Sequence, residues 1–317
     1  MSVRLFVLFL TLLTCVLETF ALPSQGEKKQ ESGPAQFRAI VDQVVLYATV
    51  YDSEGKLVSD LTQTDFKVFE DRVEQEITYF GLDDLPSSIG IVMDKSGSMR
   101  GKVDMVNQAT ELFLSQANPA NELFLIAFDD EVSLEEPLTR DVEDIRDALF
   151  NLVVSGGTAL YDAVYLAVDQ AQSGSEPKKA VIVFTDGEDK DSYYTAEELL
   201  AKVQESDVQV FIVAFLDKDL GDEGGFFGIF KSEKEKVTKI LTDIAEFTGA
   251  KAFFPEAIQD LSDVFKTIAY ELRNQYRLAY VSSNPAHDGS WRAVRVELEA
   301  ARERGLRVRA KKGYYAK

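Results

Sequence analysis

With 317 residues, 45% of them hydrophobic and 28% charged, the chain is long enough for one large domain or two ordinary ones with a packed core, which excludes wholesale disorder. A formal net charge of −20 argues against nucleic acids and anionic membranes as partners of most of the molecule. The chain has one cysteine, Cys15, and one histidine, His287. Disulfides, thiolate sites, histidine-rich zinc sites and catalysis centred on histidine are therefore not expected.

The first 21 residues have the order of a secretory signal peptide. Arg4 precedes an apolar run over residues 5–17, and Thr19-Phe20-Ala21 follows as a cleavage region. The run of about 13 mostly apolar residues is shorter than the ~20 that span a bilayer, and no later segment is apolar enough. We therefore expect a secreted, periplasmic or cell-envelope protein without a transmembrane segment after signal cleavage. Acylation of Cys15 as a lipoprotein is the alternative.

After the signal, residues 22–36 contain almost no apolar side chains and are expected to form a flexible leader. Residues 37–85 are β-rich, with strands predicted at 44–50, 66–69 and 77–80. No helix of any length is predicted in this part. It is too short to bury a stable sheet by itself.

The pattern changes at about residue 86. Ile89-Gly90-Ile91-Val92-Met93 is a short continuous apolar run, typical of a strand buried on both faces. Strands and amphipathic helices then alternate to residue 274. The further strands are predicted at 123–128, 180–184, 208–215 and 252–254, and the helices around 103–113 and at 142–152, 159–171, 196–204, 237–247 and 258–272. This alternation predicts an α/β fold: a doubly wound, mostly parallel sheet with helices on both faces.

Residues 275–317 return to a strand pattern, with alternation at 276–281, 294–298 and 306–309. This second flank is also too short to bury a sheet alone. We therefore expect residues 37–85 and 275–317 to pair into one β-sandwich, with the α/β domain of residues 86–274 inserted between them.

Three polar segments lie at comparable places in the predicted α/β domain. Asp94-Lys95-Ser96-Gly97-Ser98 follows the first buried strand, Ser155-Gly156-Gly157-Thr158 precedes a helix, and Thr185-Asp186-Gly187 closes another buried strand. Because loops at the carboxyl ends of the strands form the functional face of a doubly wound sheet, these segments are expected to meet there.

Five residues of these segments predict a cation site made only of oxygen atoms: Asp94, Ser96, Ser98, Thr158 and Asp186. Hard cations prefer such ligands, so we expect Mg²⁺, with Mn²⁺ or Ca²⁺ as alternatives. Gly97 lets the loop curl so that the two serine hydroxyls turn inward. If Asp94 and Asp186 contact the ion through water, it keeps excess positive charge, and an open position favours an Asp or Glu of a protein partner.

Other interpretations remain open at this stage. The same residues are common helix N-caps, although capping alone does not explain two hydroxyls separated by Gly97. The enzymatic alternative is metal-assisted phosphotransfer or hydrolysis with Asp94 as the nucleophile, but Ser96 stands where a second acidic residue is expected. The chain has no nucleophile elbow and no Walker motif. We therefore expect no enzyme; a purely structural assembly protein is the remaining alternative.

These motifs resemble the metal-ion-dependent adhesion site of von Willebrand factor type A domains. Asp94-Lys95-Ser96-Gly97-Ser98 is similar to the family's DxSxS element, Thr158 to its distant threonine and Asp186 to its distant aspartate. The flanks, at residues 65–71 and Gly313-Tyr314-Tyr315, resemble bacterial secreted proteins related to this family, of acidobacterial type. The resemblance implies a cation-dependent binding module that acts in adhesion or at the envelope.

A glycine-rich segment, residues 217–231, follows another predicted strand and should emerge on the same face. Its apolar side chains Phe226, Phe227, Ile229 and Phe230 either fold back onto the domain or supply contact area to a partner. On the second interpretation, these four residues are candidate partner-binding residues.

Overall fold

The computed structural model describes residues 43–216, 227–299 and 304–317, with the backbone alone for residues 227–233 and 258. The first flank contains four strands: β1 (Gln43–Tyr51), β2 (Phe66–Glu70), β3 (Val73–Gln75) and β4 (Ile77–Gly81). Its helical content within the described residues is one short 3₁₀ turn, Gln63–Asp65. The predicted signal peptide and leader lie outside the described residues.

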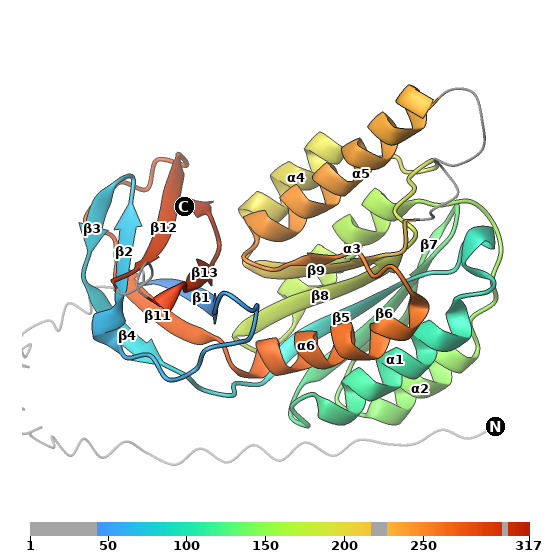
Figure 1. The fold of residues 1–317 in the computed structure, drawn as a ribbon, viewed down its shortest axis with the longest axis horizontal. Helices are drawn as coiled ribbons and strands as arrows, with labels where there is room; N and C mark the ends of the chain where they lie inside the picture. The colour runs from blue at the N-terminus through green and yellow to red at the C-terminus, as the bar shows by residue number, and fades with distance from the viewer. Residues whose placement is uncertain (1–42, 217–226, 300–303) are drawn as a thin grey trace, which may run out of the picture. The chain divides into compact units, whose positions relative to one another are not determined.

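The central part is an α/β domain with a six-stranded sheet in the order β10-β9-β8-β5-β6-β7 (Figure 1). Its strands are β5 (Ser87–Asp94), β6 (Glu122–Phe128), β7 (Val132–Thr139), β8 (Lys178–Thr185), β9 (Val208–Ala214) and β10 (Ala252–Phe253). Its helices are α1 (Val103–Gln116), α2 (Val142–Phe150), α3 (Leu160–Ser173), α4 (Ala196–Glu205), α5 (Phe227–Phe247) and α6 (Leu261–Arg273). Only β7, at one edge, is antiparallel to its neighbour, so the sheet is mostly parallel, as predicted.

Helices cover both faces of this sheet because side chains along its strands point alternately to opposite sides. On β5, Ile89 and Ile91 join the core formed with α1, α2 and α6. Val92, one position further along, joins the core formed with α3, α4 and α5. Figure 1 shows the same division of the helices between the two faces. All eight residues of β5 are buried, which explains why its sequence is a continuous apolar run.

The second flank supplies β11 (Tyr276–Val281), β12 (Trp291–Leu298), β13 (Arg307–Arg309) and β14 (Gly313–Tyr315). These strands pair with those of the first flank in two four-stranded sheets, β13-β1-β11-β4 and β14-β12-β2-β3. Phe66 and Val68 of β2, Leu46 of β1 and Tyr276 of β11 share one hydrophobic cluster. The two flanks are thus joined by strand pairing and by a common core. A sandwich arrangement of the two sheets, and the domain boundaries themselves, stay predictions.

The structure differs from the sequence prediction in two places that border the functional face. The antiparallel strand β7 was not predicted. Helix α5 begins at Phe227, ten residues before the predicted start, so the prediction of a loop reaching residue 231 was wrong for its last five residues. Phe227, Ile229 and Phe230 belong to helical backbone, whereas Phe226 lies outside the described residues. Their partner-binding role stays a prediction.

No helix within the described residues is long and apolar enough to cross a membrane.

Candidate metal site

The loop after β5 brings three of the predicted ligands together. Asp94, the last residue of the strand, is fully buried, and its Oδ1 accepts a hydrogen bond from the backbone N–H of Ser96 at 2.9 Å. The hydroxyl oxygens of Ser96 and Ser98 lie 3.1 Å apart. Residues Gly97–Met99 form a 3₁₀ turn, which folds the two hydroxyls to the same side. Ser98 is exposed, so this cluster of oxygen atoms opens to the surface.

The end of β8 is bonded directly to the end of β5. The Thr185 hydroxyl donates to Oδ2 of Asp94 at 2.8 Å and accepts from the backbone N–H of Gly187 at 3.0 Å. Asp186 therefore follows immediately after a residue that touches Asp94. The Oδ1 of Asp186 accepts from the N–H of Glu188 at 3.3 Å. Sequence analysis named Thr185 as part of a polar segment but assigned it no role, because its position at the strand end does not reveal the hydrogen bond to Asp94.

The third segment, Ser155 to Thr158, is tied to the first by backbone hydrogen bonds. The Ser155 N–H donates to the carbonyl of Lys95 at 2.9 Å, and the Gly97 N–H donates to the carbonyl of Gly156 at 3.3 Å. Thr158 is buried, and its N–H donates to Oδ2 of Asp191 at 2.7 Å. The three predicted segments therefore meet at the carboxyl ends of the strands. The bonds described here place Thr158 through its backbone and not through its hydroxyl.

Both glycines of the third segment are required by close neighbours. Gly156 has a φ of +71°, and a Cβ there would lie 1.9 Å from Oδ1 of Asp130. At Gly157 a Cβ would lie 2.0 Å from Oδ2 of Asp191. A side chain at either position would collide with a carboxylate that holds the loop. The Gly-Gly pair thus lets two acidic residues approach the backbone next to Thr158.

Asp129 and Lys95 form a further polar contact that sequence reasoning missed. The Lys95 ammonium makes an ion pair with Oδ2 of Asp129, and the Ser155 hydroxyl donates to the same oxygen at 3.0 Å. Hydrogen bonds from Lys95, Glu131 and Ser155 hold the pKa of the Asp129 carboxyl below its ordinary value, although its burial acts in the opposite direction. Asp129 directly follows β6, so the strand-end rule that found the other residues could have found it.

The electrostatics of the site favour a bound cation. Burial raises the pKa of the Asp94 carboxyl, and the negative charge of Asp186 raises it further, whereas hydrogen bonds from Ser96 and Thr185 lower it. The two carboxylates are thus close enough to repel each other. A divalent cation bound near both carboxylates would relieve this repulsion. Among the described residues no three Asp, Glu, His or Cys side chains form a metal cluster, so a cation here would need the hydroxyls as well. This donor set fits Mg²⁺.

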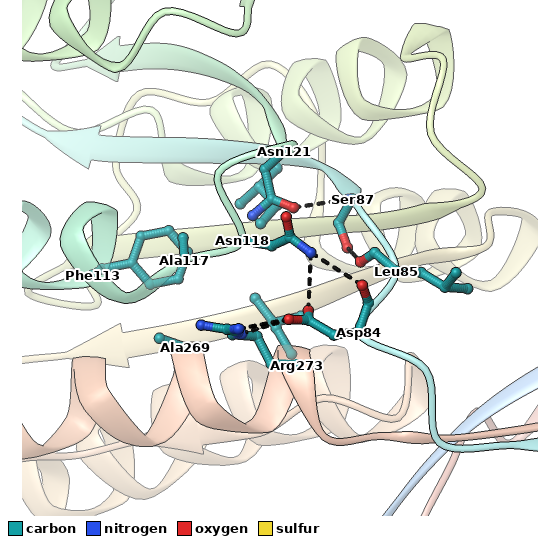
Figure 2. Close-up of a pocket in the computed structure, with 11 residues that line it drawn as sticks. Asp84, Leu85, Ser87, Phe113, Ala117, Asn118, Asn121, Ala269 and Arg273 are labelled. Atoms are coloured by element: carbon teal, nitrogen blue, oxygen red, sulfur yellow. Dashed lines mark hydrogen bonds and ion pairs between the residues drawn. The ribbon is translucent and has the colours of Figure 1, made fainter.

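A pocket at the opposite edge of the sheet has no comparable chemistry. It lies beside Ser87, at the start of β5, and its volume of about 10 Å³ suits no more than one water molecule. Figure 2 shows the Asp84 carboxylate between Asn118 and Arg273. The polar side chains that line this pocket bond to one another, so we assign it a structural role and not a ligand.

Comparison with known proteins agrees with this geometry. The family model described as von Willebrand factor type A domain matches residues 89–188, a range that includes all five predicted ligands. Inter-alpha-trypsin inhibitor heavy chain H4 from Bos taurus is 28% identical over 128 residues, which cover 35% of this chain and 14% of that protein. An uncharacterised protein from Synechocystis sp. is 30% identical over 110 residues, 33% of this chain and 26% of its own length.

The chain therefore spans about a quarter or less of these relatives. Among solved structures, a von Willebrand factor type A protein from Catenulispora acidiphila aligns over 88% of this chain and 74% of its own, with 14% identity and a TM-score of 0.47. The family match over residues 89–188, which lie in the α/β fold, shows that the chain contains a von Willebrand factor type A domain.

Proposed function

We propose that the protein is a divalent-cation-dependent binding module for another protein, acting outside the cytoplasm. The observation that carries the proposal is the bonding of three loops to one another, with Asp94 linked to both Ser96 and Thr185. The hydroxyls of Ser96, Ser98 and Thr158 would hold the cation directly, and Asp94 and Asp186 through water. The cation would supply a Lewis-acid position for a carboxylate oxygen of the partner.

Exposed apolar side chains on the chain segments that lead to or follow the predicted ligands would supply further contact area. The three most exposed large apolar side chains of the described chain are Phe150 at 88%, Tyr193 at 85% and Val153 at 73%. Phe150 and Val153 lead into Ser155, and Tyr193 lies between Asp186 and α4. The Tyr193 N–H donates to Asp162 on the first turn of α3, and its ring packs edge-on against Tyr194. These segments flank the site, as expected for contacts around a metal-bound carboxylate.

We propose binding and not catalysis because Asp94 is poorly placed as a nucleophile. Its side chain is fully buried, and each carboxylate oxygen accepts a hydrogen bond, Oδ1 from Ser96 and Oδ2 from Thr185. A nucleophilic carboxylate needs an oxygen that can reach the substrate. Secretion, expected from residues 1–21, and Mg²⁺ as the resident cation are parts of the same proposal.

Calorimetric titration with Mg²⁺, Mn²⁺ and Ca²⁺ tests the metal site, using the wild type and Ser96→Ala/Ser98→Ala. We expect the wild type to bind and the double variant to lose at least about tenfold in affinity, since two ligands are removed. Capture of partners from an envelope extract, with Mg²⁺ or with chelator, tests the binding function. A wild type that binds no cation, or partner capture that neither chelator nor the double variant reduces, would contradict the proposal.

A further inference from the structure

Asp129 is not among the predicted ligands, but it makes several hydrogen bonds to the loops that carry them. It is 5% exposed and directly follows β6. Its Oδ2 accepts from Lys95 and from the Ser155 hydroxyl, and its Oδ1 accepts from the Glu131 N–H at 3.0 Å. Its backbone carbonyl accepts from the Ala159 N–H at 2.6 Å. One residue thus uses three separate oxygen atoms to hold its surroundings.

These contacts link the two segments that carry four of the five predicted ligands. Lys95 lies between Asp94 and Ser96 in the first segment, whereas Ser155 and Ala159 bracket Thr158 in the second. The Lys95 N–H also donates to the carbonyl of Phe128, the residue before Asp129, at 2.8 Å. The end of β6 therefore fixes the first segment against the second, although it contributes no predicted ligand.

Asp129 also neutralises the positive charge of Lys95. Lys95 lies between Asp94 and Ser96, so the loop that carries three predicted ligands also carries a positive charge, and such a charge opposes the binding of a divalent cation. Both partners of the ion pair are shielded from solvent, with side-chain exposures of 16% for Lys95 and 8% for Asp129. Water and salt screen such a pair poorly, so the Asp129 carboxylate is what neutralises Lys95.

We infer that Asp129 is a positioning residue of the proposed metal site: it neutralises Lys95 and fixes the segment that carries Thr158. The inference rests on the proposed function, because it assumes that a divalent cation binds there. Asp129 itself does not touch the ion. Groups that orient metal ligands in this way commonly change metal affinity by about 10–100-fold when they are replaced.

The test uses the full chain with Asp129→Asn, Lys95→Gln and the combination of both. We expect Asp129→Asn to weaken Mg²⁺ affinity at least about tenfold. Lys95→Gln should instead strengthen it, because the negative charge of Asp129 is then no longer neutralised, and the combination should regain part of the loss caused by Asp129→Asn. Asp207→Asn is the matched control, since it breaks the Lys311–Asp207 pair before β9, at the opposite edge of the sheet.

Two measurements separate the possible outcomes. Calorimetry gives the Mg²⁺ affinity, and hydrogen exchange in chelator follows residues 155–161, where we expect Asp129→Asn to speed exchange without any metal present. Wild-type affinity together with wild-type exchange in Asp129→Asn overturns the inference. No recovery in the combined variant, or weaker binding by Lys95→Gln, overturns the part that concerns charge. A wild type that binds no Mg²⁺ overturns the proposed function instead. The exchange result still tests whether Asp129 fixes the segment that carries Thr158.

Discussion

The Lys178 ammonium, buried at the start of β8, donates a hydrogen bond to the backbone carbonyl of Leu272 in the last turn of α6. Its Nζ also lies 5.3 Å from the centroid of the Tyr47 ring on β1. One buried cation thus contacts the α/β sheet, the last helix and the first flank. The cost of this arrangement is electrostatic, because burial lowers the pKa of Lys178 from 10.5 to about 7.

This lowered pKa predicts a pH dependence of stability with a defined sign. The unfolded chain binds a proton at Lys178 up to about pH 10.5, whereas the folded chain loses it near pH 7. The penalty on folding is fully present below pH 7 and disappears as the pH rises to 10.5, by at most ~1.4 kcal/mol per pH unit. We therefore expect Lys178→Met to gain stability relative to the wild type at pH 6.5 and to lose most of this advantage by pH 9.5. Urea denaturation of both proteins at both pH values measures this difference in unfolding free energy. A difference that does not change with pH would contradict the lowered pKa of Lys178.

Removal of Glu271 should destabilise the protein strongly. This fully buried carboxylate of α6 accepts hydrogen bonds from Thr49 at 3.1 Å and Tyr51 at 2.5 Å and forms an ion pair with Arg309. Glu271→Ala leaves the Arg309 guanidinium buried without its carboxylate, which costs about 3–5 kcal/mol. Glu299→Ala is the control, since its pair with Lys67 is solvent-exposed and screened by water, so its loss should change the stability little. Denaturation midpoints measure both, and equal losses would argue against the network.

Gly156→Ala should affect both stability and metal binding. Its φ of +71° and the Asp130 oxygen 1.9 Å from a Cβ leave no room for a side chain. We expect a loss of about 1–3 kcal/mol in unfolding free energy, together with weaker Mg²⁺ binding because the loop before Thr158 shifts. Gly101→Ala is the matched control, since nothing lies within 4 Å of a Cβ there. Thermal unfolding and calorimetry measure the two effects; a Gly156→Ala protein as stable as Gly101→Ala would show that the loop adapts.

Thr185→Val tests whether the orientation of Asp94 matters. The substitution keeps the shape of the side chain but removes the donor to Asp94 Oδ2 and the acceptor for Gly187. We expect the affinity for Mg²⁺ to fall about tenfold, with Thr185→Ser close to the wild type because it keeps the hydroxyl. Titration of the three proteins decides the matter. If Val binds as well as Thr, the hydrogen bond has no part in the site.

Phe150→Ala combined with Tyr193→Ala should separate partner binding from metal binding. Both side chains are almost fully exposed, so truncation changes the unfolding free energy little. We expect Mg²⁺ affinity to stay at the wild-type value while Mg²⁺-dependent capture of partners falls severalfold. Tyr270→Ala, an exposed aromatic on α6, is the control. Loss of metal affinity in the double variant would show that these residues support the site itself.

The sequence was most informative where burial and chemistry coincide in one short segment. The apolar run ending at Met93 predicted a buried strand, and the polar residues that follow predicted what lies at its end. Asp186 was predicted by the same rule, and Thr158 from its place in a polar segment that precedes a helix. The sequence did not indicate which side chains pair across loops. Nothing near Thr185 shows that its hydroxyl bonds to Asp94, and nothing near Lys95 shows that it pairs with Asp129.

Two elements at the margins of the α/β domain, β7 and the start of α5, were harder to predict because their local sequence patterns are weak. The edge strand β7 contains Glu135, Glu136 and Pro137 and only partly buries its side chains, so it lacks the hydrophobic pattern that reveals β5. Helix α5 starts in Phe227-Gly228-Ile229-Phe230, where a glycine and a cluster of apolar residues suggested a loop. For β7, pairing with β6 sets the strand although its local sequence pattern is weak.

The pairing of the two flanks has a consequence for how the chain acquires its structure. Gln43 of β1 lies opposite Val281 of β11, and the other neighbour of β1 is β13, so β1 has no partner strand until nearly the whole chain has been synthesised. The inserted α/β domain, whose strands and helices alternate along the chain, is complete earlier. We therefore expect residues 87–272 to gain protection first in pulse-labelled refolding and β1 to follow last. Until then β1 is an unpaired, β-branched strand, which makes this interval the time at which the protein is most open to aggregation and to chaperones.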